Sequence, residues 1–359
     1  MTSRDLVQRS LSVLLLCACS LPAMAQGVGA IGGTIADSSG AVLPGATVTL
    51  SNPLGSIGGN QSAVTDDRGA FQFLRLVPGT YTVKADLQGF RPAVQTDVVV
   101  NADATARVDL KLEIGTLEEG VTVKGESPLL DTTSALRQTV LSREVLDSLP
   151  NRVDVWGAAR VIPSVILSKV DVGGSESFLQ STATVHGSNN ENGYLIDGMD
   201  VSNLDGNGTG AVLYLDPYAF QETNFQTSGA GTAVAQRGGL IFNMITRTGT
   251  NKLHGGASFN GANRSMGFGN YSPELRAQLL ASVPAVALAA NPNIVPGADI
   301  LTIYDTGAWL AGPVVRDKIW FSISAHDQRL DQYLVGNYNP DGSQVLDDNL
   351  MWTTSAKVA

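Results

Sequence analysis

The amino-acid sequence predicts a mainly β protein that begins with an antiparallel β-sandwich, continues as an α+β domain and ends in the first strands of an incomplete β-barrel. Three observations lead to this prediction. Apolar and polar residues alternate with a period of two in many segments. Turn residues recur every eight to twelve positions between residues 32 and 113. Glycine is abundant, with 39 of 359 residues, while charged residues make up only 16% of the chain, which is typical of turn-rich β structure.

The composition also excludes two classes of protein. A chain of 359 residues with 43% apolar residues is long and hydrophobic enough for two or three folded domains, so it is not disordered throughout. The formal net charge is −10 and no basic run occurs. Because nucleic-acid binding requires lysine and arginine against phosphates, we expect no nucleic-acid partner.

Residues 1–25 have the features of a cleaved signal peptide. Arg4 and Arg9 precede an apolar run, and Ala23 and Ala25 supply the small residues that a signal peptidase needs. A buried N-terminal helix is the alternative interpretation, and residues 16–19 loosely resemble a lipoprotein signal. Both cysteines lie in this segment, which excludes disulfides, cysteine zinc sites and thiol nucleophiles from the mature chain.

Residues 26–113 are expected to form the sandwich. Segments 46–50, 81–87 and 106–113 each alternate apolar with polar residues, so each predicted strand buries one face. Turns are expected at 37–40, 66–69 and 78–79, where glycine provides a positive φ and proline presets the turn. The stretches 33–48 and 65–81 resemble the carboxypeptidase regulatory-like domain. The resemblance implies a transthyretin-like or immunoglobulin-like sandwich without catalytic residues of its own.

The sequence gives no support for an enzyme, a metal site or a cofactor. None of His186, His254 and His326 is followed by a glutamate three positions later, and a catalytic zinc needs three protein ligands. Gly27–Gly32 spells a dinucleotide fingerprint but follows a cleavage site instead of a strand. Residues 205–216 match parts of a calcium loop, but no flanking helices are evident and the last ligand is aspartate.

Residues 114–127 form a hinge that contains a short β-prone run. Two interpretations are open: a last edge strand of the sandwich, or an exposed strand that pairs with the sheet edge of another protein. The candidate residues of this run are Glu119, Gly120, Val121, Thr122, Val123 and Lys124.

Residues 128–250 mix short helical and strand patterns. Ser142 is positioned to cap a short helix that ends before Pro150, and a second helix is expected around 153–162. Residues 194–200 predict a strand that runs into a tight turn, and 238–251 predict a buried strand closed by a turn.

These segments resemble the plug domain of TonB-dependent outer-membrane transporters, and the stretch 238–251 is most similar to the Oar-like branch. Leu149–Asn151 and Trp156 also carry the resemblance, whereas residues 185–187 and 234–236 depart from the family pattern. The residues matched to the plug motifs are Ile196, Asp197, Gly198, Gly238, Gly239, Thr248 and Gly249. The resemblance implies that the run at 119–124 of this chain is a TonB box, the segment with which the TonB protein pairs.

Residues 251–359 carry the pattern of outer-membrane strands, with alternating segments at 253–260, 303–313, 319–326 and 350–358. Their connections are expected to be long (263–302), short (314–318) and long (330–349), as in barrels with short periplasmic turns and long external loops. A plugged barrel of about 22 strands needs about 220 residues for strands alone. We therefore expect a truncated transporter whose barrel is incomplete.

The resemblance implies a TonB-dependent receptor that takes up a bulky nutrient by coupling to the inner-membrane TonB complex. Its partners would be TonB, outer-membrane lipid and an unknown nutrient substrate, and the sandwich would lie in the periplasm. The alternative is a secreted or periplasmic carbohydrate- or protein-binding sandwich without transport activity. In-frame DNA after residue 359 that encodes further alternating segments would favour the transporter.

Overall fold

The computed structural model describes residues 27–52, 55, 60–115, 121–124, 137–149, 154–168, 180–189, 191–203, 210–228, 238–267, 272–292, 294 and 299–359. The predicted signal peptide, Glu119, Gly120 and residues 205–209 of the calcium-like loop lie outside these residues. Among the described residues, no helix has the length and apolar character needed to cross a membrane.

The N-terminal part is a sandwich of two sheets, as the sequence predicts. One sheet contains β1 (Gly29–Asp37), β4 (Ala70–Leu76), β7 (Thr105–Arg107) and β8 (Leu110–Leu112). The other contains, in spatial order, β3 (Gln61–Val64), β2 (Thr47–Ser51), β5 (Gly79–Asp86), β6 (Ala93–Val100) and β9 (Val121–Lys124). Their inner faces enclose a core that includes Ile31, Leu50, Phe71, Tyr81 and Val98.

Two local expectations in the sandwich are wrong. The strand expected over 106–113 is divided into β7 and β8, both of which pair in parallel with β1. Between them the backbone turns toward Gly33, and the amide of Val108 donates to Gly32 O at 2.9 Å. Gly40 and Gly69 have the predicted positive φ, but Gly79 begins β5 without one.

The middle part is built on a mixed five-stranded sheet in the order β10-β15-β16-β13-β14. Its strands are β10 (Arg137–Ser142), β13 (Gly193–Ile196), β14 (Met199–Asp200), β15 (Phe220–Ser228) and β16 (Ile241–Thr246). A two-stranded sheet, β11 (Val165–Leu167) with β12 (Ala183–Val185), packs beside it. Trp156, Tyr194, Phe225 and Phe242 form the centre of a separate core.

The helices of the middle part are shorter than expected. The first is α2 (Arg143–Ser148), which follows Ser142 without a side-chain cap hydrogen bond. The second expected helix is a single 3-10 segment, η1 (Gly157–Val161), packed by its buried glycine and alanines. A further 3-10 turn, η2 (Pro217–Ala219), is capped by Asp216, whose carboxylate accepts from the Tyr218 amide.

The C-terminal part is a four-stranded antiparallel sheet, which we call the wall. It consists of β17 (His254–Asn263), β18 (Asp299–Val315), β19 (Ile319–Tyr338) and β20 (Gln344–Val358). The long connection after β17 holds η4 (Arg264–Met266), α3 (Pro273–Ala281) and α4 (Ala285–Ala290). The turn from β18 to β19 is short, as expected.

The prediction of a second long connection over 330–349 is wrong, because β19 and β20 continue as a paired ladder to Tyr338 and Gln344. Polar contacts between β19 and β20 hold this extension together. Arg329, which also pairs with Asp331 on its own strand, reaches Asp348, and the Gln332 side-chain amide donates to Asp347. Hydrogen-bonded strands therefore continue past the apolar segment that the alternation pattern detects.

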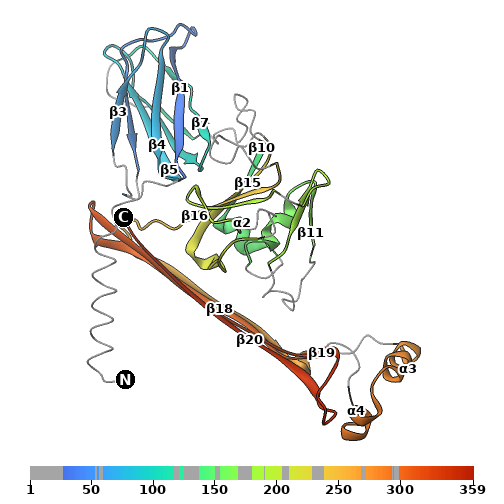
Figure 1. The fold of residues 1–359 in the computed structure, drawn as a ribbon. Helices are drawn as coiled ribbons and strands as arrows, with labels where there is room; N and C mark the ends of the chain where they lie inside the picture. The colour runs from blue at the N-terminus through green and yellow to red at the C-terminus, as the bar shows by residue number, and fades with distance from the viewer. Residues whose placement is uncertain are drawn as a thin grey trace.

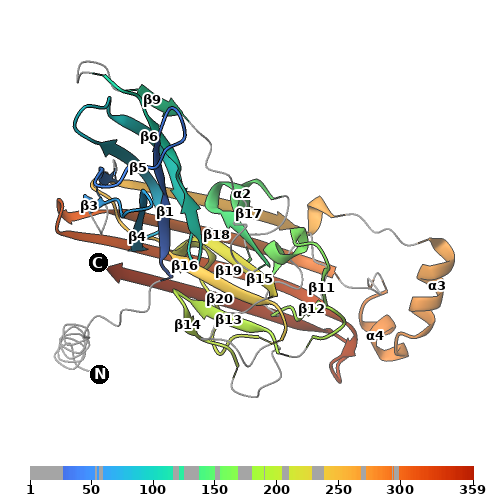
Figure 2. The same cartoon turned by 90° about the horizontal axis from the view of Figure 1, so that it is seen from above.

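Figure 1 shows the sandwich and the middle part beside one another, with the wall strands running past both. Figure 2, turned by 90°, shows the middle sheet lying over one face of the wall. Helices α3 and α4 lie at one end of the wall, where Gly342 in the β19–β20 turn approaches Val286 and Ala287.

We expect Gly33→Ala to destabilise the sandwich by more than about 2 kcal/mol, because an added Cβ would collide with the carbonyl oxygen of Val108. Gly32→Ala is the matched control in the same strand, since its Cβ would meet no atom closer than 3.6 Å. Thermal unfolding of residues 27–127, which contain the complete sandwich core, measures both variants. Equal melting temperatures for the two variants would contradict the close approach.

Candidate functional site

Four residues of the candidate TonB box, Val121–Lys124, lie at the edge of the sandwich. Residues Val121–Lys124 form β9, which pairs in parallel with β6 from Ala93↔Val121 to Thr96↔Lys124. This position corresponds to the first of the two interpretations, an edge strand of the sandwich. Recruitment of a second protein's sheet by the same strand stays a prediction.

The motif residues Ile196, Asp197 and Gly198 form a tight hairpin between β13 and β14. Asp197 has φ 50° and Gly198 has φ 84°, as a two-residue type I′ turn requires. The turn is fixed to the neighbouring strand, because the Asp197 amide donates to Met244 O at 2.9 Å and the Gly198 amide donates to Asn243 Oδ1 at 3.1 Å. The Asp-Gly pair therefore anchors one corner of the middle sheet.

The Asp197 carboxylate also joins the middle part to the wall. It accepts hydrogen bonds from the Thr246 amide at 2.9 Å and the Thr246 hydroxyl at 2.5 Å. Lys357 on β20 places its ammonium 3.1 Å from Asp197 Oδ2 and 2.6 Å from Thr246 Oγ1. Both charged side chains are largely buried, with exposed fractions of 14% for Asp197 and 21% for Lys357. This three-residue contact is the Asp197 anchor.

The glycine pair at 238–239 lets the start of β16 lie against another segment of backbone. A Cβ on Gly239 would lie 2.6 Å from Asn192 Oδ1, and one on Gly238 would lie 2.5 Å from Glu191 Oε2. Asn192 is fully buried and accepts from the Leu240 amide while donating to Ala183 O at 2.7 Å. The two glycines thus make room for an asparagine that ties β16 to β12.

The residues after β16 lead from the middle part onto the wall. Thr248 is half-buried, and Gly249 is packed so closely that a Cβ would lie 2.7 Å from Phe321 O and 2.8 Å from Gly312 O. Asn251 then closes the β18–β19 turn, because its Oδ1 accepts from the Asp317 amide and from Trp320 Nε1. The motif therefore positions the chain where the first wall strand begins.

The covered face of the wall is rich in polar residues and also holds Trp320 and Leu330, whereas the exposed face is mainly apolar. On β19, alternate residues are covered by the middle part, while Ile323 between them is 46% exposed. The covered polar residues of β18 and β19 are Asp305, Ser322, Ser324, His326 and Gln328. The exposed apolar residues of the wall include Phe259, Leu310, Ile323, Leu350, Trp352 and Val358. This is the reverse of a sheet in a water-soluble protein.

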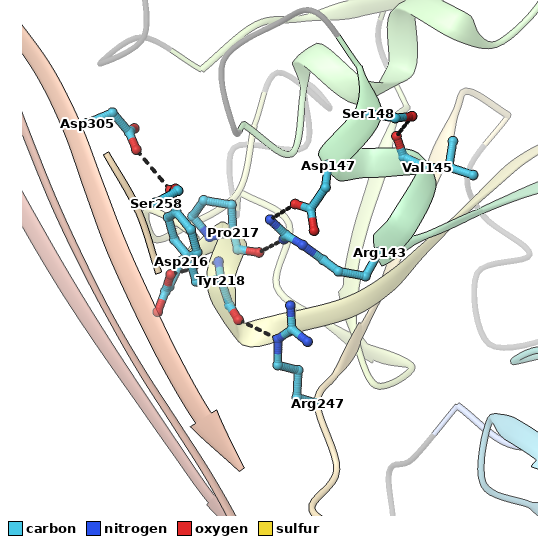
Figure 3. A network of polar contacts seen from close by, with 10 residues as sticks. All are labelled: Arg143, Val145, Asp147, Ser148, Asp216, Pro217, Tyr218, Arg247, Ser258 and Asp305. Atoms are coloured by element: carbon cyan, nitrogen blue, oxygen red, sulfur yellow. Dashed lines mark hydrogen bonds and ion pairs between the residues drawn. The ribbon is translucent and has the colours of Figure 1, made fainter. Parts of the chain in front are cut away.

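Tyr218 forms the centre of the contact between the middle part and the buried face, which we call the Tyr218 joint. Figure 3 shows its ring between Ser258 and Asp305 of the wall and the arginines of the middle part. Its hydroxyl lies 2.5 Å from Ser258 Oγ and donates to Asp305 Oδ1 at 3.2 Å. Burial raises the pKa of Tyr218 to about 12, so the hydroxyl keeps its proton. The ring covers Gly307, where any Cβ would collide with it.

Further polar contacts surround the Tyr218 joint. His326 Nε2 lies 2.9 Å from Asp305 Oδ2, and Ser324 Oγ donates to Asp216 Oδ2 at 2.6 Å. Asp216 belongs to the calcium-like loop of the sequence, and its carboxylate accepts from the Tyr218 amide of η2 and the Ser324 hydroxyl of β19. Within the described part of the chain, no group of three or more histidine, cysteine or acidic residues is arranged to hold a metal ion.

Two arginines hold η2 from the side of the middle part (Figure 3). Arg143 donates to Pro217 O at 2.8 Å and pairs with Asp147, while Arg247 Nε donates to Tyr218 O at 2.8 Å. The Arg247 guanidinium stacks on Trp309 of the wall, with Cζ 3.6 Å from the ring centroid. Burial lowers the pKa of Arg247 to about 10, which still leaves it charged at neutral pH.

Sequence reasoning did not identify the Tyr218 joint or the contact of the sandwich with the middle part. In that contact the sandwich loop at 102–103 meets Glu222, Asn224 and Asn243, which are more than a hundred residues away in the chain. The only sequence signal of these contacts is a polar residue at an inward position of a strand, such as Asn224 or His326. That signal marks burial but does not identify the partner.

The hairpin at 185–188 accounts for one departure from the family pattern. His186 has φ 52° and Gly187 has φ 80°, and Val185 and Ser188 exchange backbone hydrogen bonds. His186 Nε2 lies 3.3 Å from Thr227 O, so this side chain contacts the middle sheet. The other departure, at 234–236, lies outside the described residues.

Comparison with known proteins supports two of the resemblances. Residues 30–113 match the carboxypeptidase regulatory-like domain family. The chain is 25% identical over 293 residues to the TonB-dependent transporter Oar of Myxococcus xanthus, an alignment that covers 80% of this chain and 26% of the relative. The predicted resemblance to TonB-dependent transporters with such an N-terminal domain is therefore confirmed. The chain spans about a quarter of the length of this curated relative.

Solved outer-membrane receptors are also similar to this chain. The transporter YddB from Escherichia coli has a TM-score of 0.44 and 15% identity, and covers 62% of this chain and 30% of its own. The siderophore receptor PirA from Acinetobacter baumannii has a TM-score of 0.37 and 17% identity, and covers 54% of this chain and 24% of its own.

We expect the Asp197 anchor to stabilise the attachment of the middle part to the wall by about 1 kcal/mol. Asp197→Asn keeps an acceptor and tolerates the positive φ but removes the charge that faces Lys357. Urea unfolding of this variant, of Lys357→Met and of the double variant forms a double-mutant cycle. A coupling energy of zero would show that the ion pair contributes nothing.

Proposed function

We propose that this chain acts in TonB-dependent transport across the outer membrane, with the middle part as a plug and the wall as membrane-spanning strands. The reversed wall carries the proposal. Its apolar face is exposed, with Phe259 at 73% and Trp352 at 71%, while its polar face is buried against the middle part. A bilayer is the environment in which an exposed apolar sheet face is stable.

The polar contacts between plug and wall support the same function. A plug that must be displaced cannot be joined to the wall by a continuous hydrophobic core. Here the contact is made by discrete hydrogen bonds and ion pairs, at the Tyr218 joint and the Asp197 anchor. Such contacts can be exchanged for contacts with water when the plug moves.

The proposal includes partners and a location for each part. Outer-membrane lipid covers the apolar wall face, and the sandwich lies in the periplasm. The inner-membrane TonB complex pairs with residues 119–124 and pulls on the plug, which admits a bulky nutrient of unknown identity. The Oar relative is named a TonB-dependent transporter, which supports this assignment.

A strand that recruits TonB must first exchange partners, because β9 is paired with β6. Both pairings use backbone groups of the same four residues. Proline has no N–H to donate, so a proline in β9 weakens either ladder, whereas isoleucine preserves the donor and the β preference.

We expect Val121→Pro to reduce TonB pairing at least about tenfold and Val121→Ile to leave it unchanged. A cysteine introduced at residue 122 reports the pairing through disulfide trapping with single-cysteine variants of a TonB C-terminal domain. The mature chain is expected to contain no other cysteine, because Cys17 and Cys19 lie in the predicted signal peptide.

The melting temperature of residues 27–127 is measured for the same pair of variants. If Val121→Pro lowers this melting temperature and leaves the trapping unchanged, β9 is a structural strand of the sandwich and the TonB-box assignment fails. Loss of disulfide trapping with Val121→Pro but not with Val121→Ile supports the TonB-box assignment.

A further inference from the structure

The sandwich meets the plug in a buried polar interface around the loop at 102–103. The loop between β6 and β7 places Ala102, which is fully buried, against strand β15. The Ala102 amide donates to Glu222 Oε1 at 3.0 Å, and the Asn224 side chain donates to Ala102 O at 3.2 Å. Both main-chain groups of Ala102 thus find partners in the plug.

A second acidic residue lies beside this contact. Asp103 Oδ2 accepts from Asn243 Nδ2 at 2.6 Å, so the carboxyl groups of Asp103 and Glu222 occupy the same small interface. Glu222 is 7% exposed, and its carboxyl group accepts a hydrogen bond from the Ala102 amide. A buried carboxylate with so few donors next to a like charge is costly in its ionised form.

The groups that face Glu222 from the neighbouring strands do not compensate its charge. Ser142 is its register partner on β10 and Ile245 on β16, and neither side chain is charged. The nearby arginines are engaged elsewhere, Arg143 with Asp147 and Pro217 O, and Arg247 with Tyr218 O. Asp103 is therefore the charged group that acts on Glu222.

We propose that Glu222 is a pH-sensitive latch, which holds the sandwich on the plug while its carboxyl group is protonated and releases the sandwich when it ionises. In the protonated form the carboxyl oxygen still accepts from the Ala102 amide, and repulsion from Asp103 disappears. In the ionised form the carboxylate is better solvated by water, which it reaches only when the loop at 102–103 leaves β15. The latch does not depend on transport activity.

The direction of the pH dependence follows from the environment of the carboxyl group. Burial, and secondarily the charge of Asp103, raises the pKa of Glu222 from its usual 4.5 to about 7. The docked state therefore binds more protons than the released state between these two values. Docking is strongest below pH 4.5, weakens by up to about tenfold per pH unit as the pH rises toward 7, and changes little above it.

Pulsed electron–electron double resonance, which measures the distance between two spin labels, tests the latch on the mature chain in detergent. Spin labels at Ser62→Cys in the sandwich and Ser228→Cys in the plug occupy exposed positions. We expect a narrow distance distribution at pH 5 and a broad one at pH 8. Glu222→Gln keeps an acceptor for the Ala102 amide and loses the charge, so its distribution stays narrow at both pH values.

Two further variants make the result specific. Glu144→Gln removes an exposed acid on α2 and is expected to broaden at pH 8 like the unaltered chain. Asp103→Asn keeps the acceptor for Asn243 and tolerates the φ of 57° at this position. Because it removes the like charge beside Glu222, its distance distribution is expected to broaden less between pH 5 and pH 8 than that of the unaltered chain. A distribution that is narrow at pH 8 without any substitution, or a Glu222→Gln chain that broadens at pH 8, would overturn the proposal.

Discussion

Burial of the polar wall face is the constraint on which the rest of the structure depends. Asp305 and His326 are almost fully covered, and polar groups removed from water are stable only with partners. Asp305 contacts His326 and accepts from the Tyr218 hydroxyl of the plug. The Asp216 carboxylate of the plug accepts from Ser324 of the wall. The wall therefore requires the plug, and the position of η2 is determined by this requirement.

The same constraint explains why the plug is anchored at its corners. The hairpin at Asp197 and the segment at Gly249 both contact wall backbone or wall side chains at the end near Lys357 and Trp320. Between these anchors, Arg247 bridges the carbonyl of Tyr218 and the ring of Trp309. Because these contacts are polar or aromatic and discrete, they fix the orientation of the plug without merging its core with the wall.

Alternation of apolar and polar residues, together with turn residues, was enough to predict most of the strands and turns. The alternation at 319–326 identified both faces of β19, and the Asp-Gly pair at 197–198 identified a tight turn. Contacts between distant segments were not predictable, because neither the polar side chains of Tyr218 and Asn224 nor the main chain of Ala102 identifies a partner in the sequence. The extension of β19 beyond residue 330 was missed for a related reason: Arg329 and Asp348 stabilise the ladder by pairing across strands, and such pairing leaves no apolar alternation in the sequence.

The energetics of β9 decide whether one strand can serve both the sandwich and a partner protein. The ladder with β6 comprises four residue pairs, and each backbone hydrogen bond contributes about 0.5–1.5 kcal/mol net. The described part of the sandwich core, in contrast, contains seventeen buried residues between Ile31 and Leu112, and each large one contributes about 1.5–3 kcal/mol. Release of β9 therefore costs much less than unfolding the sandwich. An external strand that replaces the lost hydrogen bonds can remove β9 from β6 and leave the sandwich folded.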